Sequence, residues 1–200
     1  MTVCLLMSGG ADSIALCYWL RPSLALTVDY GQLAAKAEIA ASRQVCGDLG
    51  VPHTVVKIDC SQIGAGCMIT RPTSDIGLSP SLEWWPFRNQ LLITFAASVC
   101  VAREMTEVII GTVASDVVHA DGRESFVKSV DSLVAMQEGA IRVSAPAIGM
   151  TSAELARTSR VPNSLLSWAH SCHRGNLACG RCRGCNKLLA LFSELGFSCG

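Results

Sequence analysis

Charged residues are scarce in this chain. They make up 16% of its 200 residues, against about a quarter in ordinary globular proteins, and 16 basic side chains balance 16 acidic ones. A chain without an excess of positive charge is not expected to carry a long track for nucleic acid. We therefore expect no stable nucleic-acid binding.

Long apolar runs are also missing. No stretch approaches the ~18 residues that cross a bilayer, and the first residues show neither the charged flank nor the cleavage pattern of a secretory signal. We expect a soluble, cytoplasmic protein without a membrane partner.

Cysteine, by contrast, is abundant, with eleven residues. A small secreted chain would use so many in disulfides, but several lie inside apolar segments, where a reduced cysteine packs as a small hydrophobic side chain. We interpret seven as structural or incidental rather than reactive: Cys4, Cys17, Cys46, Cys60, Cys67, Cys100 and Cys199.

The order of apolar segments indicates the fold class. Half of the residues are hydrophobic, and strand-like segments alternate with helical ones, which predicts an α/β fold with a Rossmann-like parallel sheet and helices on both faces. We expect a single domain over 1–200, with a core over 1–165 and a C-terminal element over 166–200. The expected strands are 3–7, 24–29, 54–58, 107–111 and 142–146, and the expected helices are 12–20, 33–49, 89–103, 123–139, 151–158 and 186–195.

Residues 59–86 contain glycine, proline, serine and two adjacent tryptophans without a regular period. Compact domains rarely carry so long a loop without a use for it. We interpret it as a substrate or partner loop, with a plain surface excursion as the alternative.

The turn after the first predicted strand is typical of an anion site. Gly9 and Gly10 allow a phosphate to approach the main chain, Ser8 and Ser13 offer hydroxyl donors, and the helix that follows adds the positive end of its dipole. Asp12 offers a carboxylate for a magnesium ion. The spacing differs from both the P-loop and the dinucleotide fingerprint, and it resembles the SGG-x-DS pyrophosphate loop of ATP pyrophosphatases. A plain glycine-serine loop is the alternative.

Two further segments should lie beside this turn. In open parallel sheets, ligands bind at the carboxyl ends of the strands, so we expect the turn at Asp29 and the segment from Gly111 to Asp116 to converge on the same pocket.

Four cysteines near the end of the chain form a second motif. Short segments that contain glycine separate the four residues, which are Cys172, Cys179, Cys182 and Cys185. Four thiolates within so short a stretch can surround one tetrahedral ion. Zinc is the default; an iron–sulfur cluster and two disulfides are the alternatives. With four protein ligands the metal has no open position, so we expect a structural site that fastens the C-terminal helix.

Together these motifs resemble the QueC family, the 7-cyano-7-deazaguanine synthases, over nearly the whole chain. The resemblance rests on the SGG-x-DS loop, the cysteine motif and four weaker segments in the same order. These are Asp29-Tyr30-Gly31-Gln32 followed by Glu38, Arg88-Asn89, Gly111 to Asp116, and Asp121-Gly122-Arg123 with Phe126.

The resemblance implies the adenine-nucleotide α-hydrolase (PP-loop) fold, ATP and Mg²⁺ as cosubstrates, a zinc site and a homodimer. It also implies adenylation of 7-carboxy-7-deazaguanine, amide formation by an amine and then conversion to the nitrile. Asp12, Ser13 and Arg88 are the expected catalytic residues. The expected nucleotide site comprises Ser8, Gly9, Gly10, Asp12, Ser13, Asp29 and Gly111, and the expected substrate site comprises Arg88, Asn89, Asp116, Asp121 and Arg123. A helix-start charge for Arg88, and capping or solvated charges for the others, are the structural alternatives.

Several positions depart from the family pattern. Leu33-Ala34 replaces an Arg-His pair, His119-Ala120-Asp121-Gly122 lacks a Tyr-Pro and a Cys, Ser152 replaces a lysine and His173 a tyrosine. These changes fit a QueC-like antiviral-defence branch that joins the deazaguanine acid to the amine of a partner protein. A nucleotide or base sensor without turnover is the second alternative.

Overall fold

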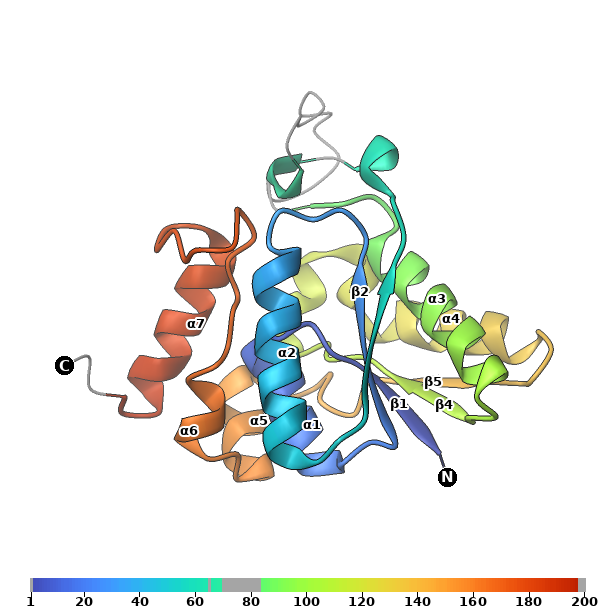
Figure 1. The fold of residues 1–200 in the computed structure, drawn as a ribbon, viewed down its shortest axis with the longest axis horizontal. Helices are drawn as coiled ribbons and strands as arrows, with labels where there is room; N and C mark the ends of the chain where they lie inside the picture. Colours follow the sequence, from blue (N-terminus) through green and yellow to red (C-terminus); the bar gives the residue numbers. More distant parts are fainter. Residues whose placement is uncertain (1, 65, 70–83, 198–200) are drawn as a thin grey trace.

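The computed structural model describes residues 2–64, 66–69 and 84–197. Its centre is a five-stranded sheet of order β3-β2-β1-β4-β5 in which every neighbouring pair is parallel (Figure 1). This confirms the predicted fold class. The strands are β1 (Val3–Leu6), β2 (Leu24–Asp29), β3 (His53–Lys57), β4 (Glu107–Ile109) and β5 (Arg142–Ser144).

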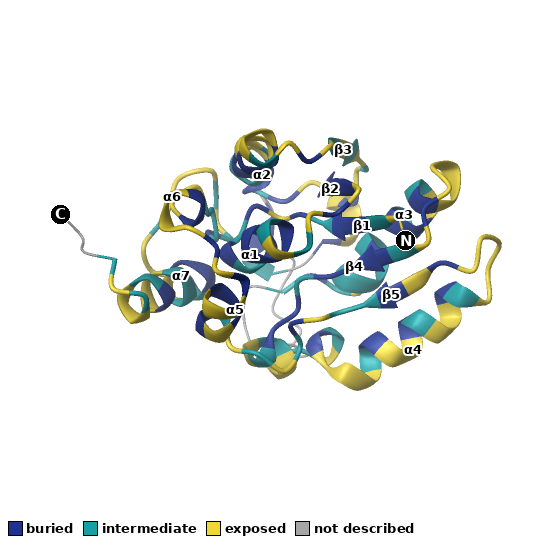
Figure 2. Ribbon diagram, turned by 90° about the horizontal axis from the view of Figure 1, so that it is seen from below, coloured by how far each residue is buried: buried dark blue, intermediate teal, exposed yellow. Residues whose placement is uncertain are grey.

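Helices cover both faces of the sheet (Figure 2). One face carries α3 (Arg88–Ala102) and α4 (Glu124–Ala135), and the other carries α1 (Ala11–Leu20), α2 (Ala35–Leu49) and α5 (Ser152–Ser159). The short α6 (Asn163–Leu166) and the C-terminal α7 (Arg183–Glu194) lie on the same side as α1 and α5. No helix among the described residues is long and apolar enough to cross a membrane.

Each face of the sheet has its own apolar core. Successive residues of β1 point to opposite faces, so Cys4 belongs to the core under α3 and α4, whereas Leu5 belongs to the core under α1, α2 and α5. Strands buried on both faces, as the central β1, β2 and β4 largely are, read as apolar runs, which makes them predictable from the sequence. Cys17 and Cys46 are likewise buried free thiols within the second core.

The structure also contains elements that the sequence did not indicate. The four-residue α6 follows Pro162 and is too short to show a helical period. The described part of the 59–86 loop forms two turns of 3-10 helix, η1 (Ser61–Ile63) and η2 (Gly66–Met68). The rest of the interpretation of that loop falls on residues 65 and 70–83, outside the described part.

The turn after β1 rests on α2 through Gly9. This residue has φ +71°, and a Cβ added to it would lie 2.6 Å from the carbonyl oxygen of Glu38 and 3.1 Å from Cβ of Ala41. Only glycine combines this left-handed conformation with so close an approach to a neighbouring backbone. The backbone of the turn is therefore fixed by a contact with a distant helix.

Substitution of Gly9 should destabilise the protein. Gly9→Ala is expected to lower the free energy of unfolding by about 1–3 kcal/mol, because it combines a strained φ with a clash. Gly47→Ala is the matched control, since Gly47 lies in α2 with no neighbouring atom within 4 Å of an added Cβ, and it should raise stability by about 0.5 kcal/mol. Urea unfolding measures both, and equal effects of the two substitutions would contradict the contact described here.

Candidate functional site

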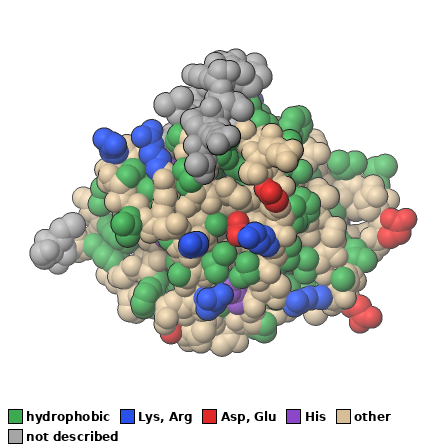
Figure 3. Space-filling model, turned by 45° about the horizontal axis from the view of Figure 1, so that its top comes forward, with side chains coloured by type: hydrophobic (Ala, Val, Ile, Leu, Met, Phe, Trp, Pro, Cys, Tyr) green, Lys and Arg blue, Asp and Glu red, His purple; other side chains and the backbone are tan. Residues whose placement is uncertain are grey.

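A pocket of about 290 Å³ opens at the carboxyl ends of β1, β2 and β4. It lies at the switch point of the sheet, because the chain leaves β1 and β4 toward opposite faces. Figure 3 brings the top of the molecule forward, where basic side chains stand apart, with acidic and apolar side chains among them. This face offers isolated charges rather than a continuous basic track.

The turn after β1 forms one wall of the pocket. Ser8 Oγ donates to Ser13 Oγ at 3.2 Å and accepts from the Gly10 N–H at 3.4 Å, and Ser13 Oγ donates to the Gly10 carbonyl at 2.9 Å. Gly10 is the N-cap of α1, and among the described residues no side chain caps this end of the helix. The positive end of α1 and two hydroxyls therefore meet at a site suited to an anion.

Two carboxylates and one ammonium group meet beside this turn. Asp12 comes from α1, and Asp116 from the 3-10 helix η3 (Ala114–Val118) after β4. Lys187 Nζ lies 2.9 Å from Asp12 Oδ2 and 3.2 Å from Asp116 Oδ1. Burial works against the charged form of Lys187, but the two carboxylates raise its pKa above the usual value, so the ammonium stays protonated.

Sequence reasoning missed Lys187. Its one signal was its place two residues after Cys185, and only the packing of α7 shows that it reaches the pocket. Lys187 and Ser152, which stands where the resemblance led us to expect a lysine, both line this pocket. The pocket therefore receives a lysine from α7, at position 187, rather than from α5 at position 152.

Arg88 and Asn89 line the opposite wall at the start of α3. Arg88 Nε donates to Asn89 Oδ1 at 3.4 Å, and one terminal nitrogen lies 3.8 Å from Met68 Sδ. Both contacts are long, so an anionic ligand could replace them with stronger charge-assisted bonds. The Asn89 amide donates to the carbonyl of Asp121 at 3.0 Å and thus fixes the turn that follows η3.

Glu38 enters the same pocket from α2. The buried amide of Gln32 donates to Glu38 Oε2 at 2.8 Å and to the Val28 carbonyl at 3.2 Å, and its oxygen accepts from the Tyr30 N–H. Burial raises the pKa of Glu38 to about 7, although the Gln32 hydrogen bond and nearby Arg88 oppose this shift. Glu38 is therefore a carboxyl group that can be neutral or charged near neutral pH.

Other predicted site residues lie around the pocket rather than in its wall. Asp29 Oδ1 accepts from the Gly31 N–H at 3.2 Å, and Arg123 Nε donates to the Val117 carbonyl at 3.2 Å. Asp121 contacts Asn89, whereas Gly9 supports the turn from beneath. Ser8, Gly10, Asp12, Ser13, Arg88, Asn89, Gly111 and Asp116 all line the pocket.

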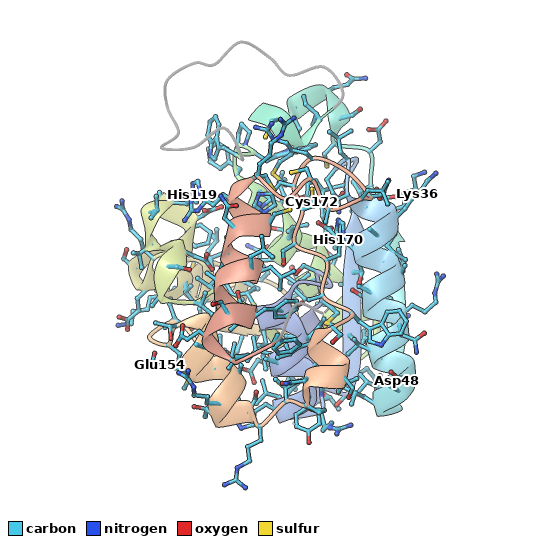
Figure 4. The ribbon with its side chains drawn as sticks, turned by 90° about the vertical axis from the view of Figure 1, so that its left-hand side faces the viewer. Lys36, Asp48, His119, Glu154, His170 and Cys172 are labelled. Carbon is cyan, nitrogen blue, oxygen red and sulfur yellow. The ribbon has the colours of Figure 1, made fainter. Side chains whose placement is uncertain are left out.

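Histidines complete the wall near α7. Figure 4 places His119 beside the N-terminal end of α7, and His170 and Cys172 between α7 and α2. Arg183 lies 2.9 Å from His119 Nε2, and because a guanidinium can only donate, this ring nitrogen accepts. Burial and Arg183 lower the pKa of His119 and favour its neutral form.

The four predicted cysteines come together at the start of α7. Their Sγ atoms all lie within 4.8 Å of one another, and Cys179 Sγ is 4.0 Å from Cys185 Sγ. Backbone N–H groups of Arg181 and Cys182 lower the pKa of Cys179 to about 6, which favours the thiolate that binds metals. A Cβ on Gly184 would collide with the carbonyl oxygen of Ser171, so glycine is required for the chain to fold back here.

This sulfur group fits a tetrahedral metal. Zinc–sulfur bonds of about 2.3 Å place tetrahedral sulfur atoms about 3.8 Å apart, close to the observed spacing. The four cysteines could therefore hold zinc, with every coordination position filled by protein.

A family model described as "Queuosine biosynthesis protein QueC" matches residues 2–196. The chain belongs to the QueC family. It is 28% identical to the 7-cyano-7-deazaguanine synthase of Methanosarcina barkeri, covering 96% of this chain and 93% of that relative. Identity to the 7-cyano-7-deazaguanine synthase of Desulforudis audaxviator is 32%, with 92% of each chain covered. The curated relatives of this QueC-family chain are synthases, so it belongs to a family of enzymes.

Two solved structures have a similar fold. The U34-tRNA thiolase NcsA of Methanococcus maripaludis, with its [4Fe-4S] cluster, superposes with a TM-score of 0.54 at 14% identity, covering 96% of this chain and 64% of that one. The NMN synthetase of Francisella tularensis superposes with a TM-score of 0.52 at 14% identity, covering 98% of this chain and 73% of that one. These likenesses concern the fold alone.

Loss of a cluster cysteine should release the metal and destabilise the protein. Cys182→Ala is expected to abolish stoichiometric metal binding and to cost several kcal/mol, because metal binding at a structural site is part of the folding free energy. Cys46→Ala, which removes a buried thiol from α2, should keep the metal. Elemental analysis and thermal unfolding test this, and equal metal content in the two variants would refute a cysteine-bound ion.

Proposed function

We propose that this protein uses ATP to adenylate the carboxylate of 7-carboxy-7-deazaguanine and then transfers the acyl group to an amine. The observation that carries this proposal is one pocket that the SGG-x-DS turn, Asp12, Asp116 and Arg88 all line, in a chain of the QueC family. The names of the curated relatives support the deazaguanine substrate.

The chemistry explains the use of ATP. An amine that meets a carboxylate only exchanges a proton, because oxide is too poor a leaving group. When a carboxylate oxygen attacks the α-phosphorus, an oxygen–phosphorus bond forms, the bond to the β-phosphate oxygen breaks and pyrophosphate leaves. The amine then attacks the acyl carbon, AMP departs and the amine's surplus proton goes to solvent. A second ATP would activate the amide oxygen and lead to the nitrile.

The residues of the pocket suit these roles. Ser8, Gly10 and Ser13 would hold pyrophosphate through hydroxyl and backbone N–H groups at the N-terminal end of α1, and Gly9 would support this turn from beneath. Arg88 would pair with the substrate carboxylate or the α-phosphate.

Asp12 fits a magnesium ion, because its Oδ1 is buried and accepts no hydrogen bond from the described residues. When bound, magnesium neutralises phosphate charge.

The experiment that tests this function identifies the product. The protein is incubated with 7-carboxy-7-deazaguanine, ATP and magnesium, with ammonia in one arm and proteins encoded by neighbouring genes in another, and products are weighed by mass spectrometry. A free amide or nitrile in the ammonia arm supports the proposal. A protein that gains the deazaguanine acyl mass supports the defence alternative suggested by Leu33-Ala34 and Ser152. If no arm releases pyrophosphate and AMP, the proposed enzymatic activity is refuted. The alternative of a nucleotide or base sensor without turnover is then favoured.

Replacement of Asp12 should stop turnover without unfolding the chain. Asp12→Asn is expected to reduce pyrophosphate release by about 100-fold or more, since it removes a charged ligand where phosphate charge must be neutralised. Asp48→Asn on α2, whose carboxylate accepts from Gln44, is the matched control and should keep full activity. Full pyrophosphate release by Asp12→Asn would overturn the assignment of Asp12.

A further inference from the structure

We propose that Lys187 is a positioning residue of the nucleotide site, which holds Asp12 and Asp116 in the ligand-free protein and gives up Asp12 to the divalent cation that arrives with ATP. The proposal rests on the proposed function for its reaction, but its first test needs neither substrate nor turnover. Lys187 acts through the two carboxylates.

The geometry places one cation between two anions from separate elements. Lys187 extends from α7, Asp12 from the first turn of α1, and Asp116 from η3 after β4. The Nζ distances of 2.9 and 3.2 Å are those of charge-assisted hydrogen bonds. The Lys187 and Asp116 side chains are 33% exposed and that of Asp12 is 18% exposed, so water screens these charges only in part.

One carboxylate oxygen of Asp12 does not contact Lys187. The Oδ2 atom faces Lys187, whereas the Oδ1 atom is buried and has no hydrogen-bond partner among the described residues. An unpartnered carboxylate oxygen in a polar pocket is costly, and a divalent cation with oxygen ligands would satisfy it. A divalent cation bound at Oδ1 would lie beside the ammonium on Oδ2, and the repulsion between these two positive charges favours release of Asp12 by Lys187.

The lysine also reduces the charge that ATP meets. Asp12 and Asp116 alone would present two negative charges to a strongly anionic ligand, and the ammonium halves that net charge. A lysine suits this exchange because its compact charge sits on a flexible four-carbon stem with three donors. After it releases Asp12, the ammonium can still hold Asp116.

The start of α7 determines where Lys187 stands. Cys182 is the N-cap of this helix, with its Sγ accepting from the Cys185 N–H at 3.4 Å. Arg183, one position on, donates to the Ser115 carbonyl at 3.2 Å and contacts His119. The first turn of α7 is thus joined both to the cysteine group and to the 114–119 segment that carries Asp116.

The first test measures cation binding without nucleotide. Mn²⁺ is titrated into wild-type, Lys187→Met and Lys187→Arg protein and followed by electron paramagnetic resonance. We expect Lys187→Met to bind Mn²⁺ about tenfold more tightly than wild type, because the competing ammonium is gone, and Lys187→Arg to stay near wild type. If Lys187→Met fails to fold, Lys187→Gln serves the same purpose.

Arg157→Met is the control for loosening of α7. Arg157 pairs with Glu194 at 3.1 Å, at the other end of this helix and outside the pocket, so its loss should leave Mn²⁺ affinity unchanged. Equal Mn²⁺ affinity in wild-type and Lys187→Met protein would overturn the proposal. A gain in affinity that Arg157→Met shares would also overturn it, since the cause would then be helix packing.

The second test follows pyrophosphate release. Lys187→Met should raise the KM for MgATP about tenfold and lower the free Mg²⁺ needed for half-maximal rate, with kcat changed less than KM. A fall in kcat alone, with KM and the Mg²⁺ dependence unchanged, would contradict a role in exchanging cations. If no protein releases pyrophosphate, the proposed function fails, and the Mn²⁺ titration still decides the role of Lys187.

Discussion

Two carboxylates and an ammonium group meet where β1 and β4 end. The wall of the pocket depends on this pairing, because the ammonium allows the two carboxylates to lie close together. Asp12 and Asp116 converge because the two parallel strands place their carboxyl ends together. Carboxylates so close repel unless a cation lies between them. Lys187 supplies that charge from α7, so the C-terminal element forms part of the pocket wall and is not only a structural appendage.

Contacts of the first turn of α7 connect the cysteine group to the pocket. The sulfur group forms beside the first turn of α7, and that turn carries Arg183 toward the 114–119 segment and Lys187 toward Asp12. On the other side of the pocket, Gly9 rests on the Glu38 carbonyl, and Gln32 holds the Glu38 carboxyl. The Ser8–Ser13 turn thus lies between α2, which contacts Gly9, and α7, whose Lys187 pairs with Asp12.

Much of this arrangement could be predicted from the sequence, for local reasons. The buried strands read as apolar runs, and the Ser8–Ser13 turn has a recognisable spacing. The short spacing between the four cysteines restricts them to positions around a common point. Lys187 could not be predicted, because its position depends on how α7 packs against α5. Asp29 and Arg123 belong to recognisable segments, but their backbone partners, Gly31 and Val117, become visible only when the turns are folded.

The proposed attack of a substrate carboxylate on the α-phosphorus of ATP can be tested by following an oxygen label from that carboxylate. The carboxylate of 7-carboxy-7-deazaguanine is labelled with heavy oxygen, and the products of a reaction with ATP and an amine are weighed by mass spectrometry. This attack predicts one labelled oxygen in AMP, because the oxygen that joins the α-phosphorus leaves with it when the amine attacks the acyl carbon. Label in inorganic phosphate, or turnover with unlabelled AMP, would contradict it.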